Sequence, residues 1–261
     1  MLLLLLRIVT APLILGAASL ASRRWGAAVG GVLAAIPLVT GSVSFFVSLE
    51  QGPSFGSRVA TATLIGVGTL AWFSLAYAWA SRRFDWPICL ACGMAIVLAG
   101  SVVVFAFTEA PGIAAFTYAV ASLAVASRML PPAEAAPRAT PPVWDIPARM
   151  ATAAFLVVGI TGAAEVVGPQ LSGLLAAFPL VFAALLVFTH RHEGAESARG
   201  LLRGFLMGLV ATSLFLEIIA DGLVPLGIGP AFVAAIVVFL GYQTAAISWL
   251  RRPVASLEGA A

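Results

Sequence analysis

Long apolar runs separated by short polar segments are the feature that most constrains this chain. A helix needs about 20 apolar residues to cross the hydrocarbon core of a bilayer, and nine runs approach or reach that length. Of the 261 residues 61% are hydrophobic and 10% charged, whereas about 25% of a soluble domain is charged. A compact soluble fold could not bury so much apolar surface, so we predict an all-α, polytopic membrane helical bundle. The predicted spans are residues 3–22, 26–48, 59–80, 86–107, 112–128, 148–166, 170–189, 201–220 and 227–249.

The basic residues indicate how the chain is oriented. All 14 are arginines, and with nine spans every one except Arg7 and Arg58 falls on the same side. Because cytoplasmic loops are enriched in arginine, we predict an N-terminus outside the cytoplasm and a C-terminus inside it. The arginines lie singly or in pairs at the ends of apolar runs and form no basic face, which argues against nucleic acid as a partner. Ser19-Leu20-Ala21 resembles a signal-peptide cleavage site, but no basic residue precedes the leucine run, so we expect the first span to be retained.

The chain also contains an internal repeat. A shift of 142 residues aligns 5–75 with 147–217 without gaps and gives 17 identities. The clearest match sets the segment from Gly31 to Val39 against the segment from Gly173 to Val181. The number of identities is higher than two segments rich in alanine and leucine would share by composition alone. The matched positions also include proline and arginine, which are rarer residues.

The two copies are predicted to be inverted. Each contains four spans and a fifth lies between them, so an odd number of crossings separates them. The loop charges agree, because Arg23-Arg24 correspond to Glu165-Val166 and Arg82-Arg83 to Val224-Pro225. The predicted organisation is a first four-helix repeat (1–107), a linking helix with a Pro/Ala-rich linker (108–146), a second repeat (147–250) and a cytoplasmic tail (251–261).

A family resemblance follows from the second copy. The segment from Gly173 to Phe182, followed by His192-Glu193-Gly194 and an arginine-bearing start to the next helix, resembles the GlpM-type small bacterial inner-membrane proteins. The resemblance is best over 147–217, is weaker over the first half and does not cover the fifth span. It implies a fused tandem pair of such four-span units located in a bacterial inner membrane, and it implies no particular substrate.

Two prolines lie inside predicted spans at equivalent positions of the repeats, Pro37 and Pro179. A proline within a helix removes one backbone hydrogen bond, and in lipid the freed carbonyl needs another partner. Two interpretations stay open: a pair of broken helices that line a central site, or static kinks.

Three sets of polar residues are candidates for binding or coupling. Arg7 and Arg149 are equivalent, and each has a threonine one turn later, Thr10 or Thr152. Such a guanidinium could hold a phosphate or carboxylate with two hydrogen bonds, or it could contact lipid headgroups at the interface. Glu217 is the one acid placed firmly within a span, where it could couple protons, pair with Arg7 or lie shallow enough to reach water.

The remaining reactive residues predict little chemistry. His190 and His192 flank Arg191 and are expected to be solvated loop residues, because two histidines lack the further ligands of a metal site. Cys89 and Cys92 are expected to be small packing residues with reduced thiols. No phosphate loop, nucleophilic triad or carboxylate pair is present in the sequence, so we expect no enzyme, no cofactor and no metal.

These features favour a transporter or lipid translocase that works by alternating access of two inverted repeats. The expected partners are membrane lipids and a small anionic or lipid-phosphate substrate. The alternatives are a non-transporting membrane scaffold or assembly partner, which the scarcity of polar residues in the spans favours, and an ion channel, for which no ring of polar residues is visible.

Overall fold

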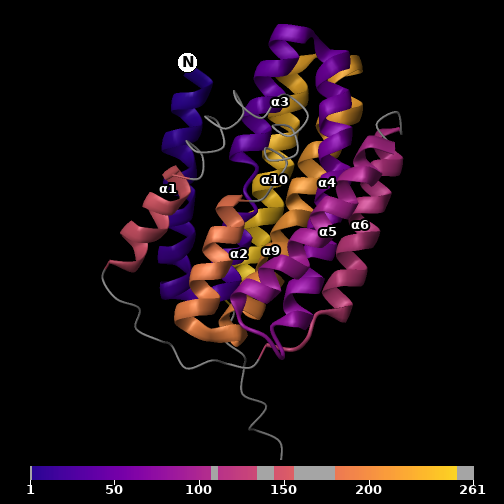
Figure 1. Ribbon diagram of the computed structural model, residues 1–261. Helices are drawn as coiled ribbons and strands as arrows, with labels where there is room; N and C mark the ends of the chain where they lie inside the picture. Colours follow the sequence, from indigo (N-terminus) through magenta and orange to yellow (C-terminus); the bar gives the residue numbers. More distant parts are fainter. Residues whose placement is uncertain (1, 107–110, 134–143, 156–179, 252–261) are drawn as a thin grey trace, which may run out of the picture.

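The computed structural model describes residues 2–106, 111–133, 144–155 and 180–251, and all regular secondary structure within these ranges is helical. The prediction of an all-α fold is therefore confirmed. A further short helix, residues 145–155, carries no label in Figure 1. The labelled helices are α1 (Leu2–Trp25), α2 (Ala27–Ala34), α3 (Leu38–Gln51), α4 (Pro53–Ala80), α5 (Trp86–Ala106), α6 (Gly112–Met129), α9 (Leu180–Leu226) and α10 (Ile228–Leu250).

Several of these helices are apolar and long enough to cross a membrane. Within the described residues this holds for α4, α6, the Phe182–Leu226 part of α9, and α10. The outer face of α10 exposes Val233 and Val237, each 64% accessible, which suits contact with lipid better than contact with water. The structure is thus that of a membrane-embedded helical protein.

Glycines with positive φ mark the sharp turns between helices. Gly52 (φ 88°, ψ 164°) joins α3 to α4, and Gly194 (φ 87°, ψ 172°) divides α9 into two helices. These torsions lie in a region that residues with a Cβ rarely adopt, so glycine is required at both turns. Predicted span 59–80 in fact begins earlier, at Pro53, because the proline directly after Gly52 is suited to a first helical position.

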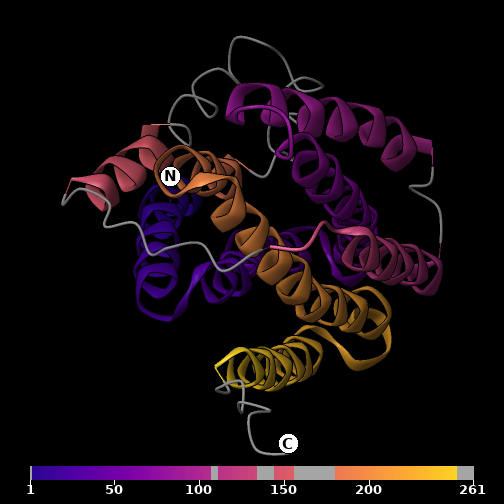
Figure 2. The ribbon, with the colours of Figure 1, turned by 90° about the horizontal axis from the view of Figure 1, so that it is seen from below.

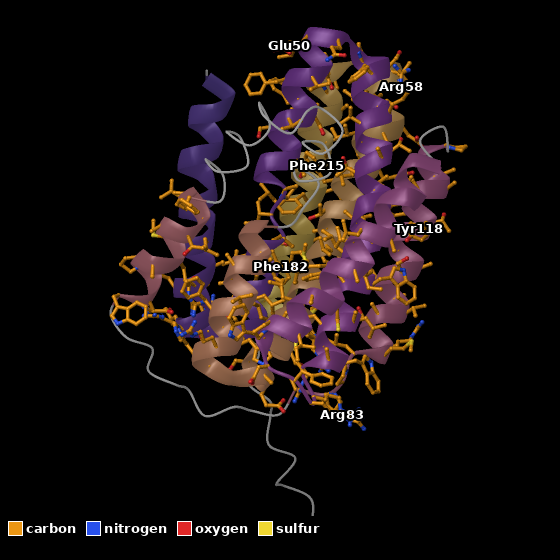
Figure 3. The ribbon with its side chains drawn as sticks, viewed as in Figure 1. Glu50, Arg58, Arg83, Tyr118, Phe182 and Phe215 are labelled. Atoms are coloured by element: carbon orange, nitrogen blue, oxygen red, sulfur yellow. The ribbon has the colours of Figure 1, made fainter. Side chains whose placement is uncertain are left out.

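The two turns lie at opposite ends of the bundle. Glu50 and Arg58, which flank the Gly52 turn, lie at one end, and Arg83 lies at the other (Figure 3). The residues that follow Gly194 are near Arg83, since Arg199 contacts Ser81. We call the end that contains Arg83 the arginine-rich end. It also holds Arg251, whose guanidinium lies 5.0 Å from the Trp25 ring.

Helix α9 is the centre of the packing. It contacts α2, α4, α6 and α10, and Figure 2 shows it running through the middle of the bundle. Its contact with α2 is close because glycines occupy the crossing point on both sides: a Cβ at Gly31 would overlap the Leu201 carbonyl, and one at Gly204 would overlap the Ala28 carbonyl. Small residues that let two helix backbones approach are typical of membrane bundles.

The second predicted span is broken rather than continuous. Helix α2 ends at Ala34, and α3 begins at Leu38 with Pro37 as its N-cap residue. Two side chains from other helices satisfy carbonyls near the break. Gln243 Nε2 donates to the Val32 oxygen at 2.6 Å, and Thr212 Oγ1 donates to the Ala35 oxygen at 2.7 Å. A helix break inside an apolar bundle requires such partners.

Candidate functional site: a buried ion-pair network

The described polar residues gather most densely around Asp145 at the arginine-rich end. Its carboxylate oxygens lie 2.7 Å from Arg23 Nη2, 2.8 Å from Arg149 Nε and 2.6 Å from His192 Nδ1. The Asp145 side chain is fully buried and that of Arg149 is 1% exposed. Buried charges are tolerated when they are paired in this way, and three separate parts of the chain are tied together as a result.

Arg149 has further partners. Its Nη2 lies 3.1 Å from Glu193 Oε1, its Nη1 donates to Thr189 Oγ1 at 3.2 Å, and its guanidinium carbon lies 5.7 Å from the centre of the Phe188 ring. The guanidinium is therefore surrounded by two carboxylates, a hydroxyl and an aromatic ring. An incoming anion would have to displace one of these groups.

Local sequence explains how the network forms. Asp145 begins the 145–155 helix, where the positive end of the helix dipole favours a carboxylate, and Arg149 follows one turn later on the same face. The turn at Gly194 follows directly after His192 and Glu193. Arg23 comes from the last turn of α1.

The charges around Asp145 control its protonation. Burial by itself would raise the pKa of this carboxyl. The hydrogen bond from His192, the charge of Arg149 and the hydrogen bond from Arg23 outweigh burial, and the pKa lies below its ordinary value. Asp145 is therefore an anion at neutral pH and acts as a fixed acceptor rather than a proton carrier.

A second polar cluster lies nearby between α4 and α9. Tyr77 Oη and His190 Nδ1 are 2.9 Å apart, Arg199 Nη1 donates to Ser81 Oγ at 3.4 Å, and Arg199 also pairs with Glu196. His190 is 8% exposed. The prediction that His190 is a solvated loop residue is thus wrong, because the end of α9's first half packs against α4 instead of projecting into water. His192 is half-buried against Asp145, so the same prediction fails there.

The other residues predicted for a site are dispersed. Thr152 Oγ1 donates to the Ala148 carbonyl of its own helix at 2.8 Å, which leaves it in a local bond. The side chains of Arg7 and Thr10 lie outside the described part of the structure, as does Pro179. Glu217 is half-buried in the second half of α9, and its Oε2 has no hydrogen-bond partner among the described residues.

Sequence reasoning missed Asp145, Glu193, Thr212 and Gln243. Two of them carried a signal. Asp145 stands four residues before Arg149, the spacing of an ion pair on one helix face, and Gln243 is the one amide side chain in predicted span 227–249. Glu193 was noted only as part of the motif that follows Phe182, and no local pattern marks its pairing with Arg149 or the contact of Thr212 with Ala35, because these partners are distant in sequence.

Within the described ranges, no group of three histidine, cysteine or acidic residues is placed to hold a metal ion. Comparisons with protein-family models, with curated proteins and with solved structures found no match to this chain. The fold and the site therefore define the class without a family: a membrane-embedded all-α bundle with a charged, interhelical network at one end.

Proposed function

We propose that this protein is an inner-membrane transporter or lipid translocase for an anionic or phosphate-bearing substrate, built from two inverted GlpM-like repeats. In such carriers, two halves related by a pseudo-twofold axis exchange conformations and expose a central site first to one side and then to the other. The proposed orientation keeps the arginine-rich end in the cytoplasm.

The observation that carries this proposal is the pair of turns at Gly52 and Gly194. They are equivalent under the 142-residue shift, they have nearly the same torsions, and they lie at opposite ends of the bundle. Inverted repeats require this combination, whereas parallel repeats would bring equivalent turns to the same end.

A pair of related contacts adds support. The shift makes Ser57 equivalent to Arg199, and, continued three residues beyond the aligned range, it pairs Ala78 with Ala220. Ser57 Oγ donates to the Ala220 carbonyl, while Arg199 reaches the Ala78 carbonyl through the hydroxyl of Ser81. The interface between α4 and the second half of α9 therefore has a direct contact at one end and an indirect contact at the other.

The ion-pair network fits the role of a gate. It joins α1, the 145–155 helix and α9, and its side chains can separate without breaking a covalent or backbone bond. In the proposed cycle, the substrate's anionic group replaces Glu193 on Arg149, which loosens the network and opens the cytoplasmic end. Arg7 has the equivalent role in the other half, and Glu217 carries the coupling proton.

The test is flux in proteoliposomes with candidate phosphate-bearing solutes and fluorescent phospholipids. Arg7→Ala and Glu217→Gln are expected to reduce flux at least about tenfold, the effect of losing one charge-assisted interaction. Arg58→Ala, an exposed arginine that forms no described ion pair, is the matched control and is expected to retain flux. Unchanged flux in both site variants would contradict the mechanism.

A second candidate, a non-transporting scaffold, is favoured by the close α2–α9 contact at Gly31 and Gly204. Halves that pack backbone to backbone are suited to a rigid support. This candidate predicts a partner protein that co-purifies in a fixed ratio. It also predicts no flux of the tested solutes or lipids in proteoliposomes, whichever way the protein is inserted.

A further inference from the structure

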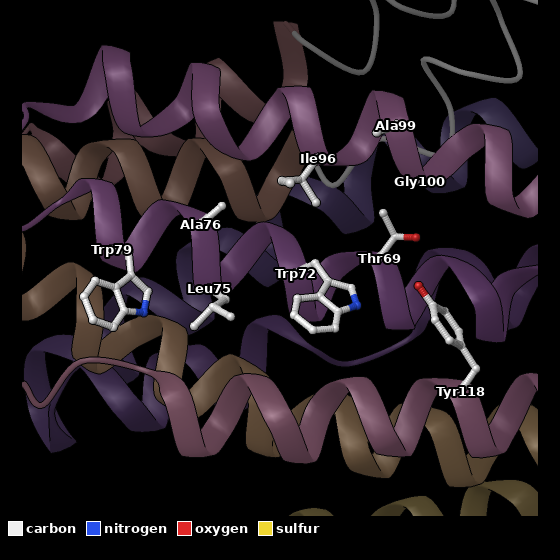
Figure 4. A pocket seen from close by; sticks show the side chains of 9 residues that line it. All are labelled: Thr69, Trp72, Leu75, Ala76, Trp79, Ile96, Ala99, Gly100 and Tyr118. Carbon is white, nitrogen blue, oxygen red and sulfur yellow. The ribbon is translucent and has the colours of Figure 1, made fainter.

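An apolar groove runs along the outside of α4. Helices α5 and α6 both pack against α4, and between them lies a cavity of about 420 Å³ (Figure 4). Its floor is formed by one face of α4 that includes Thr69, Trp72, Ala76 and Trp79. Ala99 of α5 and Tyr118 of α6 stand on its two sides.

The groove has the length of a single acyl chain. From Thr69 to Trp79 the α4 helix advances about 15 Å, at 1.5 Å per residue. This is half of the roughly 30 Å hydrocarbon core of a bilayer, which is the depth that the chain of one lipid leaflet occupies.

A second, more polar cavity of about 340 Å³ continues from the groove at the arginine-rich end. The two cavities share Trp79, whose indole Nε1 donates to the Met129 carbonyl at 3.0 Å and so joins the ends of α4 and α6. The second cavity is lined by Arg82, Arg199 and Glu196, together with the Met129–Pro132 segment.

The charges in this second cavity suit an anion. The exposed Arg82 guanidinium lies 4.9 Å from the centre of the Trp79 ring and forms no ion pair with a described acid. Arg199 is 8% exposed, and although Glu196 and Ser81 contact its terminal nitrogens, its buried Nε has no hydrogen-bond partner in the described structure. Glu196 pairs with Arg199, whereas Arg82 has no ion-pair partner among the described residues.

We infer that the groove and the arginine-lined cavity together bind one anionic phospholipid of the leaflet at the arginine-rich end. The acyl chain lies along α4 between α5 and α6, and the phosphate meets Arg82 and Arg199 beyond Trp79. The site lies outside the proposed Arg149 gate, so it holds a resident lipid and does not depend on transport.

The test compares three added probes on the purified full chain in detergent: phosphatidylglycerol, phosphatidylcholine and inorganic phosphate. Thermal unfolding and native mass spectrometry report binding. We expect phosphatidylglycerol to raise the unfolding midpoint and to remain bound, and inorganic phosphate, which has no acyl chain, to have no effect. Phosphatidylcholine is expected to bind about tenfold more weakly, equivalent to about 1.4 kcal/mol, because its choline cation offsets the charge of the phosphate that both lipids carry and is repelled by the arginines.

Two variants test separately how the lipid headgroup and the acyl chain contribute to binding. Arg82→Gln is expected to remove the preference for phosphatidylglycerol, and Ala99→Phe, which fills the groove from an exposed position, is expected to lower the binding of both lipids. Arg58→Gln at the other end and Ala245→Phe on α10 are the matched controls. Equal binding of the two lipids, site variants that behave like their controls, or a stabilisation that inorganic phosphate reproduces would each overturn the inference.

Discussion

At the scale of single residues, the fully buried Asp145 organises the arginine-rich end. It accepts hydrogen bonds from Arg23 and His192 and forms an ion pair with Arg149, and of these three residues only Arg149 is near it in sequence. A buried carboxylate with several donors is sensitive to change, because the removal of one charge leaves the opposite charge buried and uncompensated.

Asp145→Asn is therefore expected to destabilise the protein by about 3 kcal/mol, near the lower end for breaking a buried pair because Glu193 still neutralises Arg149. The measurement is unfolding in detergent followed by size-exclusion chromatography. Glu50→Gln, which changes an exposed acid at the other end, is the control and should be neutral. Equal stability of the two variants would show that the network contributes nothing.

The same residue predicts a pH dependence. A carboxyl whose pKa is lower in the folded than in the unfolded state stabilises the fold above its ordinary pKa of about 3.9, and this contribution is lost as the pH falls through the folded value. The stability difference between wild type and Asp145→Asn should not shrink from about pH 8 to about pH 5, and it should shrink below about pH 4. A difference that already shrinks between pH 8 and pH 5 would contradict this assignment.

The sequence could indicate that some charged residues of the network around Asp145 are candidates for a site, but it could not indicate which residues they contact. Arg149 was a candidate from the repeat alone, whereas its contact with Glu193 depends on the turn at Gly194. The pairing of Arg23 with Asp145 spans 122 residues, and no local pattern reports such a distance.

At the scale of helices, the repeat-equivalent glycines Gly66 and Gly208 have different surroundings. A Cβ at Gly208 would lie 2.6 Å from Ala35 Cβ and 2.8 Å from the Val32 oxygen, while a Cβ at Gly66 would meet nothing within 4 Å. The second-half glycine thus faces α2, and the first-half glycine faces open space.

Gly208→Ala is expected to destabilise the protein by about 1–3 kcal/mol through overpacking. Gly66→Ala is the matched control and should stabilise it by about 0.5–1 kcal/mol, because alanine favours a helix more than glycine does. Thermal unfolding of the two variants under the same conditions provides the comparison. Similar midpoints would contradict the α2–α9 packing.

The broken α2–α3 element gives another prediction. Gln243→Leu removes the amide that satisfies the Val32 carbonyl, and the cost is expected to be about 1 kcal/mol, as for other hydrogen bonds between membrane helices. The neighbouring Thr244 is exposed and bonds only within α10, so Thr244→Val is the control. If the two variants melt alike, the bond to α2 is not a stabilising contact.

Helix positions were the most predictable part of the fold. Apolar run lengths predicted α6 and α10 to within one residue or so of their ends, because the hydrocarbon core of a bilayer sets the minimum length of an apolar span. The early start of α4 and the burial of His190 were not predictable, since they depend on the Gly52 turn and on packing between distant segments.

At the scale of the whole molecule, the charged residues and the two glycine turns are both distributed between opposite ends of the bundle. Arg23, Arg199 and Arg251 take part in contacts at the arginine-rich end, while Glu50 and Arg58 lie at the other. This separation of charges is what the proposed orientation requires.

The most direct test of that antiparallel arrangement is single-cysteine labelling with a membrane-impermeant maleimide, in a background in which Cys89 and Cys92 are alanine. Glu50→Cys and Arg191→Cys probe the chain just before the equivalent turns at Gly52 and Gly194, and both positions are exposed. The account predicts that Glu50→Cys reacts in intact spheroplasts and that Arg191→Cys reacts only after permeabilisation. Labelling of both positions from the same side would contradict it.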